Sequence, residues 1–142
     1  MCADYLETLG LEVVDLKENT LKKLEASGTM HPAYSRHNPL DLVGDALPER
    51  YQIAINTLLS EDYVDGMIVI QTLQTMTDPI ADAQIVVDAH HAYPAKPILC
   101  VYMGGKFSQE GIRLLQKNNI PDFNDLKKAA VCMRALCERK RN

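Results

Sequence analysis

The 142-residue sequence lacks an excess of positive charge, and it has no long uninterrupted apolar run. Its formal net charge of −4 at pH 7 excludes the basic surface with which nucleic-acid-binding domains contact phosphates. No apolar stretch approaches the ~20 residues that a membrane-spanning helix needs. The residues after Met1, Cys-Ala-Asp-Tyr-Leu-Glu, also lack the basic and then apolar segments of a secretory signal. These absences predict a cytoplasmic protein that binds neither nucleic acid nor a membrane.

The sequence also lacks the residue spacings of metal and redox sites. None of the cysteines forms a CxxC pair, so we expect free thiols of the kind that a reducing compartment maintains. The adjacent His90 and His91 point about 100° apart on an expected helix and are poorly placed to hold one metal ion. His31 and His37 lie in an expected loop without a third ligand at useful spacing, so we expect no metal site. The cysteines are Cys2, Cys100, Cys132 and Cys137.

What the sequence does contain is a regular alternation of short apolar segments and amphipathic helices. Its 46% apolar and 24% charged residues suit a single globular domain over residues 1–142. This alternation predicts an α/β fold with a mostly parallel sheet and right-handed crossovers. Strands are expected at 11–16, 40–42, 67–71, 97–103 and 120–123. Helices are expected at 3–9, 19–26, 49–60, 79–92 and 109–117, and from about residue 125 to the end.

One stretch, residues 38–48, combines an expected strand, a glycine turn and a helix start. It reads Asn-Pro-Leu-Asp-Leu-Val-Gly-Asp-Ala-Leu-Pro. Gly44 can adopt backbone angles closed to other residues, and Asp45 is a plausible N-cap for the helix that follows. A free helix N-terminus after such a turn presents backbone N–H groups that bind anions, above all phosphate. We therefore predict phosphate binding at Gly44, Asp45 and Ala46. The alternative is that the turn is only a connection.

Ligands of parallel sheets gather outside the carboxyl ends of the strands. That edge is expected to combine the turn at 44–46 with two further loops, which contain Thr75 and Thr77, and Gly104 and Gly105. None of these segments offers a nucleophile with a paired base, and a P-loop is also absent. We therefore expect binding at this edge and no catalytic residue in the chain.

The sequence of residues 38–46 closely resembles the NPxDLxGDA motif of the NDP-forming acyl-CoA synthetases. These are the ADP-forming acetate:CoA ligases, which are relatives of succinyl-CoA synthetase. Residues 64–70 and 75–79 are similar to the family's VDGVLVI strand and TDP helix start. Residues 96–105 and 111–121 resemble its KPVLAVxxGG and GxxLLxxxGIP segments, with Asn119 in the place of a glycine. The resemblance covers nearly the whole chain and keeps the motifs in order.

The resemblance implies one module of a multidomain enzyme, namely its second flavodoxin-like domain. That domain is a three-layer sandwich with a mostly parallel sheet, and here it lacks the first strand of the family pattern. The complete enzyme converts acyl-CoA, ADP and phosphate into the free acid, CoA and ATP. It therefore uses CoA, ADP or ATP, and Mg, although no cofactor is expected in this chain. The implied partners are the CoA-binding and phosphohistidine domain and the ATP-grasp domain of the same enzyme.

The resemblance also implies a role for the turn at 44–46. In the related ligases a phosphohistidine between two domains can be held by two helix N-termini, and the helix opening at 46–48 resembles one of them. Gly44 would let the phosphoryl group approach, while Asn38 and Asp41 would brace the loop. The isolated chain is expected to be inactive, because it lacks the histidine, the CoA site and the nucleotide site.

Two alternatives to this function remain open at the level of sequence. One is a free-standing interaction module derived from the enzyme, and the other is the equivalent domain of a synthetase-like protein lysine acetyltransferase. The missing first strand has a separate consequence, because it would leave residues 11–16 without their neighbour in the sheet. An exposed apolar face or a homodimer is then expected.

Overall fold

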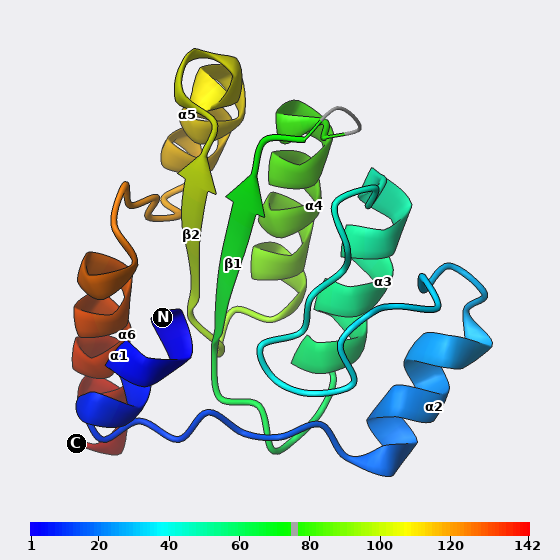
Figure 1. The fold of residues 1–142 in the computed structure, drawn as a ribbon. Coiled ribbons are helices and arrows are strands. Elements are labelled where there is room, and N and C mark those ends of the chain that lie inside the picture. Colours follow the sequence, from blue (N-terminus) through cyan, green and yellow to red (C-terminus); the bar gives the residue numbers. More distant parts are fainter. Residues whose placement is uncertain (75–76) are drawn as a thin grey trace.

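The structure is a computed structural model that describes residues 1–74 and 77–142. Its central feature is a parallel pair of strands, β1 (Met67–Thr72) and β2 (Ile98–Met103), which point the same way in Figure 1. Their register runs from Met67 opposite Ile98 to Thr72 opposite Met103. The predicted strands at 67–71 and 97–103 are therefore confirmed, and so is the α/β fold class.

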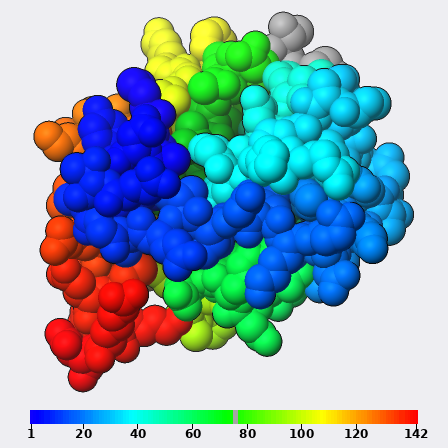
Figure 2. All heavy atoms as spheres, turned by 60° about the horizontal axis from the view of Figure 1, so that its bottom comes forward, coloured from blue at the N-terminus to red at the C-terminus, as the bar shows by residue number. Residues whose placement is uncertain are grey.

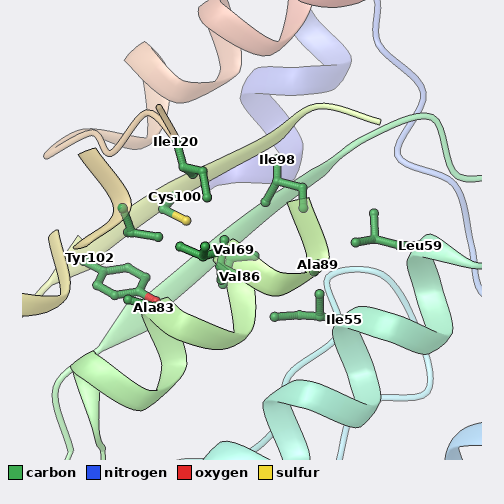
Figure 3. Close-up of a cluster of buried hydrophobic side chains, with 12 residues drawn as sticks. Ile55, Leu59, Val69, Ala83, Val86, Ala89, Ile98, Cys100, Tyr102 and Ile120 are labelled. Carbon is green, nitrogen blue, oxygen red and sulfur yellow. The ribbon is translucent and has the colours of Figure 1, made fainter. Parts of the chain in front are cut away.

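Helices cover both faces of this pair. On one face α1 (Cys2–Thr8) packs against α6 (Leu126–Arg141), and on the other lie α3 (Pro48–Leu59), α4 (Pro79–Ala92) and α5 (Gln109–Lys117). The close-up in Figure 3 shows the strands between these two helical layers. A short 3₁₀ helix, η1 (Gly105–Ser108), precedes α5, and α2 (Glu18–Ala26) packs on the outer side of α3. No helix of the described residues is long and apolar enough to cross a membrane.

Two of the predicted strands are wrong. Residues 11–16 are extended but belong to no strand, and they cross the amino-terminal end of the strands as the blue segment in Figures 1 and 2. A β-prone run forms a strand only beside a partner edge, and here Val14 O accepts instead from Asn38 Nδ2 at 2.9 Å. Residues 40–42 form no strand either, because Leu40 and Leu42 pack into a cluster with α2 and α3.

The last predicted strand, at 120–123, is reduced to a single bridge. Cys100 pairs with Asp122 in parallel fashion, through Cys100 N to Pro121 O at 2.9 Å and Phe123 N to Cys100 O at 2.8 Å. The order across the sheet is therefore β1, β2 and then this bridge. The result is a flavodoxin-like α/β arrangement in which part of the sheet is absent from the described residues.

Aspartates cap α4 and α6. Asp78 Oδ1 accepts from Ala81 N at 3.0 Å, so α4 begins at Pro79 as predicted. Asp125 Oδ1 accepts from the N–H groups of Lys127 and Lys128 and starts α6. A carboxylate at this position satisfies N–H groups that have no partner within the helix and also suits the helix dipole.

The main hydrophobic core lies between the sheet and the layer formed by α3, α4 and α5 (Figure 3). A second, smaller cluster joins α2 to α3 and includes Leu21, Leu24 and Ala54. The second cluster matters for the site, because it anchors the loop that carries residues 40–43 against these helices.

Candidate functional site: the carboxyl edge of the sheet

Three loops meet at the carboxyl ends of the strands. A Cβ placed on Gly44 would lie 3.6 Å from Cγ of Gln74, in the loop after β1. A Cβ on Gly104 would lie 3.1 Å from Cβ of Leu73, in the same loop. The turn at 44–46, the β1–α4 loop and the glycines after β2 therefore form one continuous edge. In Figure 1 the helices α3, α4 and α5 all begin at this end of the molecule.

The turn itself differs from its predicted geometry. The N-cap of α3 is Leu47, without a side-chain hydrogen bond, so Asp45 is not the cap. The residue with left-handed backbone angles is Val43, at φ 70°, and Gly44 is not among the residues with positive φ. Ala46 is buried, and its N–H donates to Val43 O at 3.1 Å. The N–H of Gly44, by contrast, donates no backbone hydrogen bond within the described residues, and the N–H of Asp45 contacts its own carboxylate.

Two side chains singled out in the sequence hold this turn from its start. Asp41 Oδ1 accepts from Val43 N at 2.8 Å, which ties the carboxylate to the left-handed residue. Asn38 Nδ2 donates to Val14 O and so links the loop to the extended segment at 11–16. A β-branched residue with positive φ is strained by about 1–3 kcal/mol. The Asp41 contact is one of the interactions that keep Val43 in this conformation.

Arg50 is the residue of this site that the sequence analysis missed. Its mostly buried guanidinium donates through Nη1 to Leu42 O at 2.8 Å and to Asp45 Oδ1 at 2.6 Å. Its Nε donates to Thr29 O at 2.9 Å. The hydrogen bond from Arg50 is the largest influence on Asp45, and it lowers the pKa of that carboxyl. Arg50 therefore fixes both flanks of Gly44 and compensates the charge of Asp45.

We expect Arg50→Met to lower the free energy of unfolding by about 1.5 kcal/mol, because the partly buried carbonyl groups of Thr29 and Leu42 lose a charged donor. Urea unfolding of the wild type, Arg50→Met and Arg50→Lys measures this effect. Lysine keeps the charge but can make only some of the contacts, so the free energy of unfolding of Arg50→Lys should lie between those of the wild type and Arg50→Met. Equal stability of Arg50→Met and the wild type would show that the guanidinium contacts contribute nothing.

The β1–α4 loop is held by Thr77, one of the predicted edge residues. Its hydroxyl accepts from Gln74 N at 2.9 Å, and its own N–H donates to Gln74 O at 3.0 Å. Because Gln74 lies beside Gly44, Thr77 fixes the neighbour of the turn. Thr75, which the sequence also places at this edge, lies outside the described residues.

A shallow cleft of about 680 Å³ opens at the same edge, between the end of β2, α5 and the start of α6. Gly104 and Gly105 line it, together with Asp122 and Lys128. Asp122 Oδ1 accepts from Tyr102 N at 3.0 Å, and burial raises the pKa of this carboxyl. Within the described ranges, no three His, Cys, Asp or Glu side chains gather to hold a metal ion.

Large apolar side chains are exposed around this edge. Leu47 precedes α3, Ile80 lies in the first turn of α4, Met103 ends β2 and Phe107 lies in η1. Each is between 41% and 77% exposed. Contiguous patches of exposed apolar side chains are typical of surfaces that contact another protein.

Comparison with known proteins relates the whole chain to one enzyme group. It is 30% identical over 146 aligned residues to subunit alpha of the acetate–CoA ligase [ADP-forming] II of Pyrococcus furiosus, covering 100% of this chain and 31% of that subunit. It is 31% identical to acetate–CoA ligase [ADP-forming] I of Archaeoglobus fulgidus, covering 88% of this chain and 17% of that protein. The chain thus spans less than a third of the length of these relatives. No protein-family model matches it.

Comparison with solved structures gives the same relationship over almost the whole chain. A crystal structure of a protein from Pyrococcus horikoshii OT3 superposes with a TM-score of 0.86 at 30% identity, over 99% of this chain and 32% of that one. The acetyl-coenzyme A synthetase 1 of Ca. Korarchaeum cryptofilum, solved in complex with phosphate and ADP, gives a TM-score of 0.86 at 25% identity. That match covers 99% of this chain and 30% of the synthetase.

Proposed function

Because this chain is related along its whole length to one region of the ADP-forming acetate–CoA ligases, we propose that it acts as a domain of such an acyl-CoA synthetase. The complete enzyme would form ATP and a free acid from acyl-CoA, ADP and phosphate, with Mg as the companion of the nucleotide. This chain would bind the phosphoryl group in transit and would not catalyse the reaction alone.

The proposed phosphoryl site is the turn before α3. The N–H of Gly44 makes no other backbone hydrogen bond in the part of the chain described, the N–H of Asp45 meets only its own carboxylate, and the 12-residue α3 contributes its dipole. In a closed site, fixed N–H dipoles of this kind are worth roughly a few kcal/mol to a charged group. The Asp45 carboxylate alone would repel an anion, but the Arg50 guanidinium forms an ion pair with it and compensates its negative charge. The supporting observation is the position of this turn beside Gln74 at the carboxyl edge.

A partner domain of the same enzyme would complete the site. The phosphohistidine would come from that domain, since nothing in this chain resembles its histidine loop. Leu47, Ile80 and Phe107 are exposed at the edge where the two domains would meet. Burial of such side chains supplies association energy of about 25 cal/mol per Å², before the costs of docking. The edge therefore suits a protein partner as well as an anion.

Phosphate titration followed by amide NMR tests this proposal directly. We expect saturable shifts confined to residues 44–49 and to the turn at 104–105, and we expect Gly44→Val to abolish them. Gly44 has no positive φ, and an added Cβ would meet Gln74 only at ordinary contact distance, so the variant should fold. A chloride titration at equal ionic strength removes general salt effects.

Two results would speak against the phosphoryl site. One is a set of shifts centred on the basic last turn of α6, at Arg139, Lys140 and Arg141, which would indicate only general attraction of anions. The other is the absence of shifts both alone and with the rest of the Pyrococcus furiosus subunit added. If that subunit binds the chain without any response to phosphate, the chain is better described as an interaction module.

A further inference from the structure

Beneath the carboxyl edge lies a small buried polar cluster, which consists of Gln71, Asp82 and Tyr102. Gln71 of β1 and Tyr102 of β2 are register partners, so their side chains leave the sheet on the same face. Gln71 Nε2 donates to Asp82 Oδ2, in the first turn of α4. Figure 3 shows Tyr102 reaching towards Ala83, the residue after Asp82. All three residues are at most 4% exposed.

Each member of the cluster has one side-chain oxygen without a partner. These atoms are Gln71 Oε1, Asp82 Oδ1 and Tyr102 Oη, and no described group bonds to them. A buried ionised carboxylate with a free oxygen is costly, whereas a neutral carboxyl can donate its proton to an acceptor. The unpartnered acceptor Gln71 Oε1 belongs to the same side chain whose Nε2 already donates to Asp82 Oδ2. One added hydrogen on Asp82 would therefore serve both Asp82 and a neighbour.

The surroundings of Asp82 also favour its protonated form. Burial and the Asp78 carboxylate raise the pKa of Asp82 to about 7, against a smaller lowering by Gln71. From α3, Tyr51 faces the cluster, and burial together with Asp82 raises its pKa to about 12. The Asp122 carboxylate adds negative potential at Tyr102. Among the described residues, α5 and η1 place no cation that lowers the Asp82 pKa.

We propose that Asp82 is a proton-binding residue of the folded protein, and that its ionisation loosens the start of α4 at the carboxyl edge. Asp82 N donates to Asp78 O at 3.0 Å, and Asp78 caps the helix. A charged Asp82 must reach water or a donor, and that movement displaces the cap. Thr77 and Gln74 precede the cap and support Gly44. The edge would then be ordered at acidic pH, half-opened near neutral pH and opened at alkaline pH.

Carboxyl-carbon NMR of the wild-type protein tests the first half of the proposal without any variant. We expect the Asp82 Cγ resonance to titrate with a midpoint near 7, well above the ordinary value of about 3.9. Asp88, which is exposed on the same helix and accepts from Gln84, provides a second carboxyl resonance of α4 for comparison. A midpoint of Asp82 near 4 would overturn the proposal.

Amide hydrogen exchange tests the second half. Between about pH 5.5 and pH 8.5 we expect the protection factors of residues 81–84 to fall by about tenfold or more in the wild type. Asp82→Asn keeps the shape and cannot ionise, so its protection factors should stay constant, whereas Asp88→Asn should behave as the wild type. A wild type whose protection is independent of pH, or an Asp82→Asn variant that loses protection equally, would refute the coupling.

Discussion

Replacing Leu115 by alanine is expected to lower the free energy of unfolding by about 3 kcal/mol. Leu115 of α5 is fully buried in the main core. Its carbonyl oxygen also accepts from Ile120 N at 3.0 Å, so the surrounding backbone is tied down and cannot collapse freely into the space left behind. The loss then combines the transfer free energy of the deleted atoms with the cost of a cavity.

Urea unfolding gives the size of this effect, and Leu47→Ala is the matched control. Leu47 undergoes the same chemical change, but it is half exposed, so its expected change is within about 0.5 kcal/mol. The two variants should reverse their order in a docking assay with a partner domain, where Leu47 contributes and Leu115 does not. Equal losses of stability in the two variants would mean that the core of the isolated chain is not packed as described.

The helices were predictable because their signals are local. Asp78 followed by Pro79, and Asp125 before the apolar stripe of α6, are cap signals that need no distant partner. The strands at 67–72 and 98–103 were predictable because their apolar runs are buried or half-buried over most of their length. The run at 11–16 has the same β-prone composition but no adjacent edge, and pairing is not a property of the run itself.

The site shows the same division between local and distant interactions. The meeting of the β1–α4 loop with the glycines after β2 was predictable, because βα loops lie at the carboxyl ends of parallel strands, whereas the turn at 44–46 follows no strand. The detailed roles were not predictable, because Asp45 had two possible partners, the N–H groups of α3 and the Arg50 guanidinium, and Arg50 also spans to Thr29. The burial of Asp82 could not be predicted from the sequence either. An acid in the first turn of a helix is ordinarily explained by the helix dipole, and only Gln71 on β1 reveals the cluster.

Gly111→Ala is expected to lower the free energy of unfolding by about 2–3 kcal/mol, although alanine is more favourable than glycine in a helix interior by about 1 kcal/mol. Gly111 lies in the first turn of α5, and an added Cβ would lie 2.5 Å from Pro79 O and 2.9 Å from Pro79 C. These are backbone atoms of the first residue of α4, so no side chain can rotate away. The two helices would have to separate at their N-terminal ends.

The strain falls at the carboxyl edge, where the proposed site lies. The Gly111→Ala variant can therefore be examined for two separate effects, a loss of stability and a change in the geometry of this edge. Thermal unfolding measures the first, with Glu110→Ala at the exposed neighbouring position as the control for helix propensity, expected within about 0.5 kcal/mol of the wild type. Amide shifts of residues 77–82 and 104–108 measure the second and should change in Gly111→Ala alone. Unchanged or increased stability of Gly111→Ala would show that α4 and α5 part without cost, and the edge could then not be held rigid by their contact.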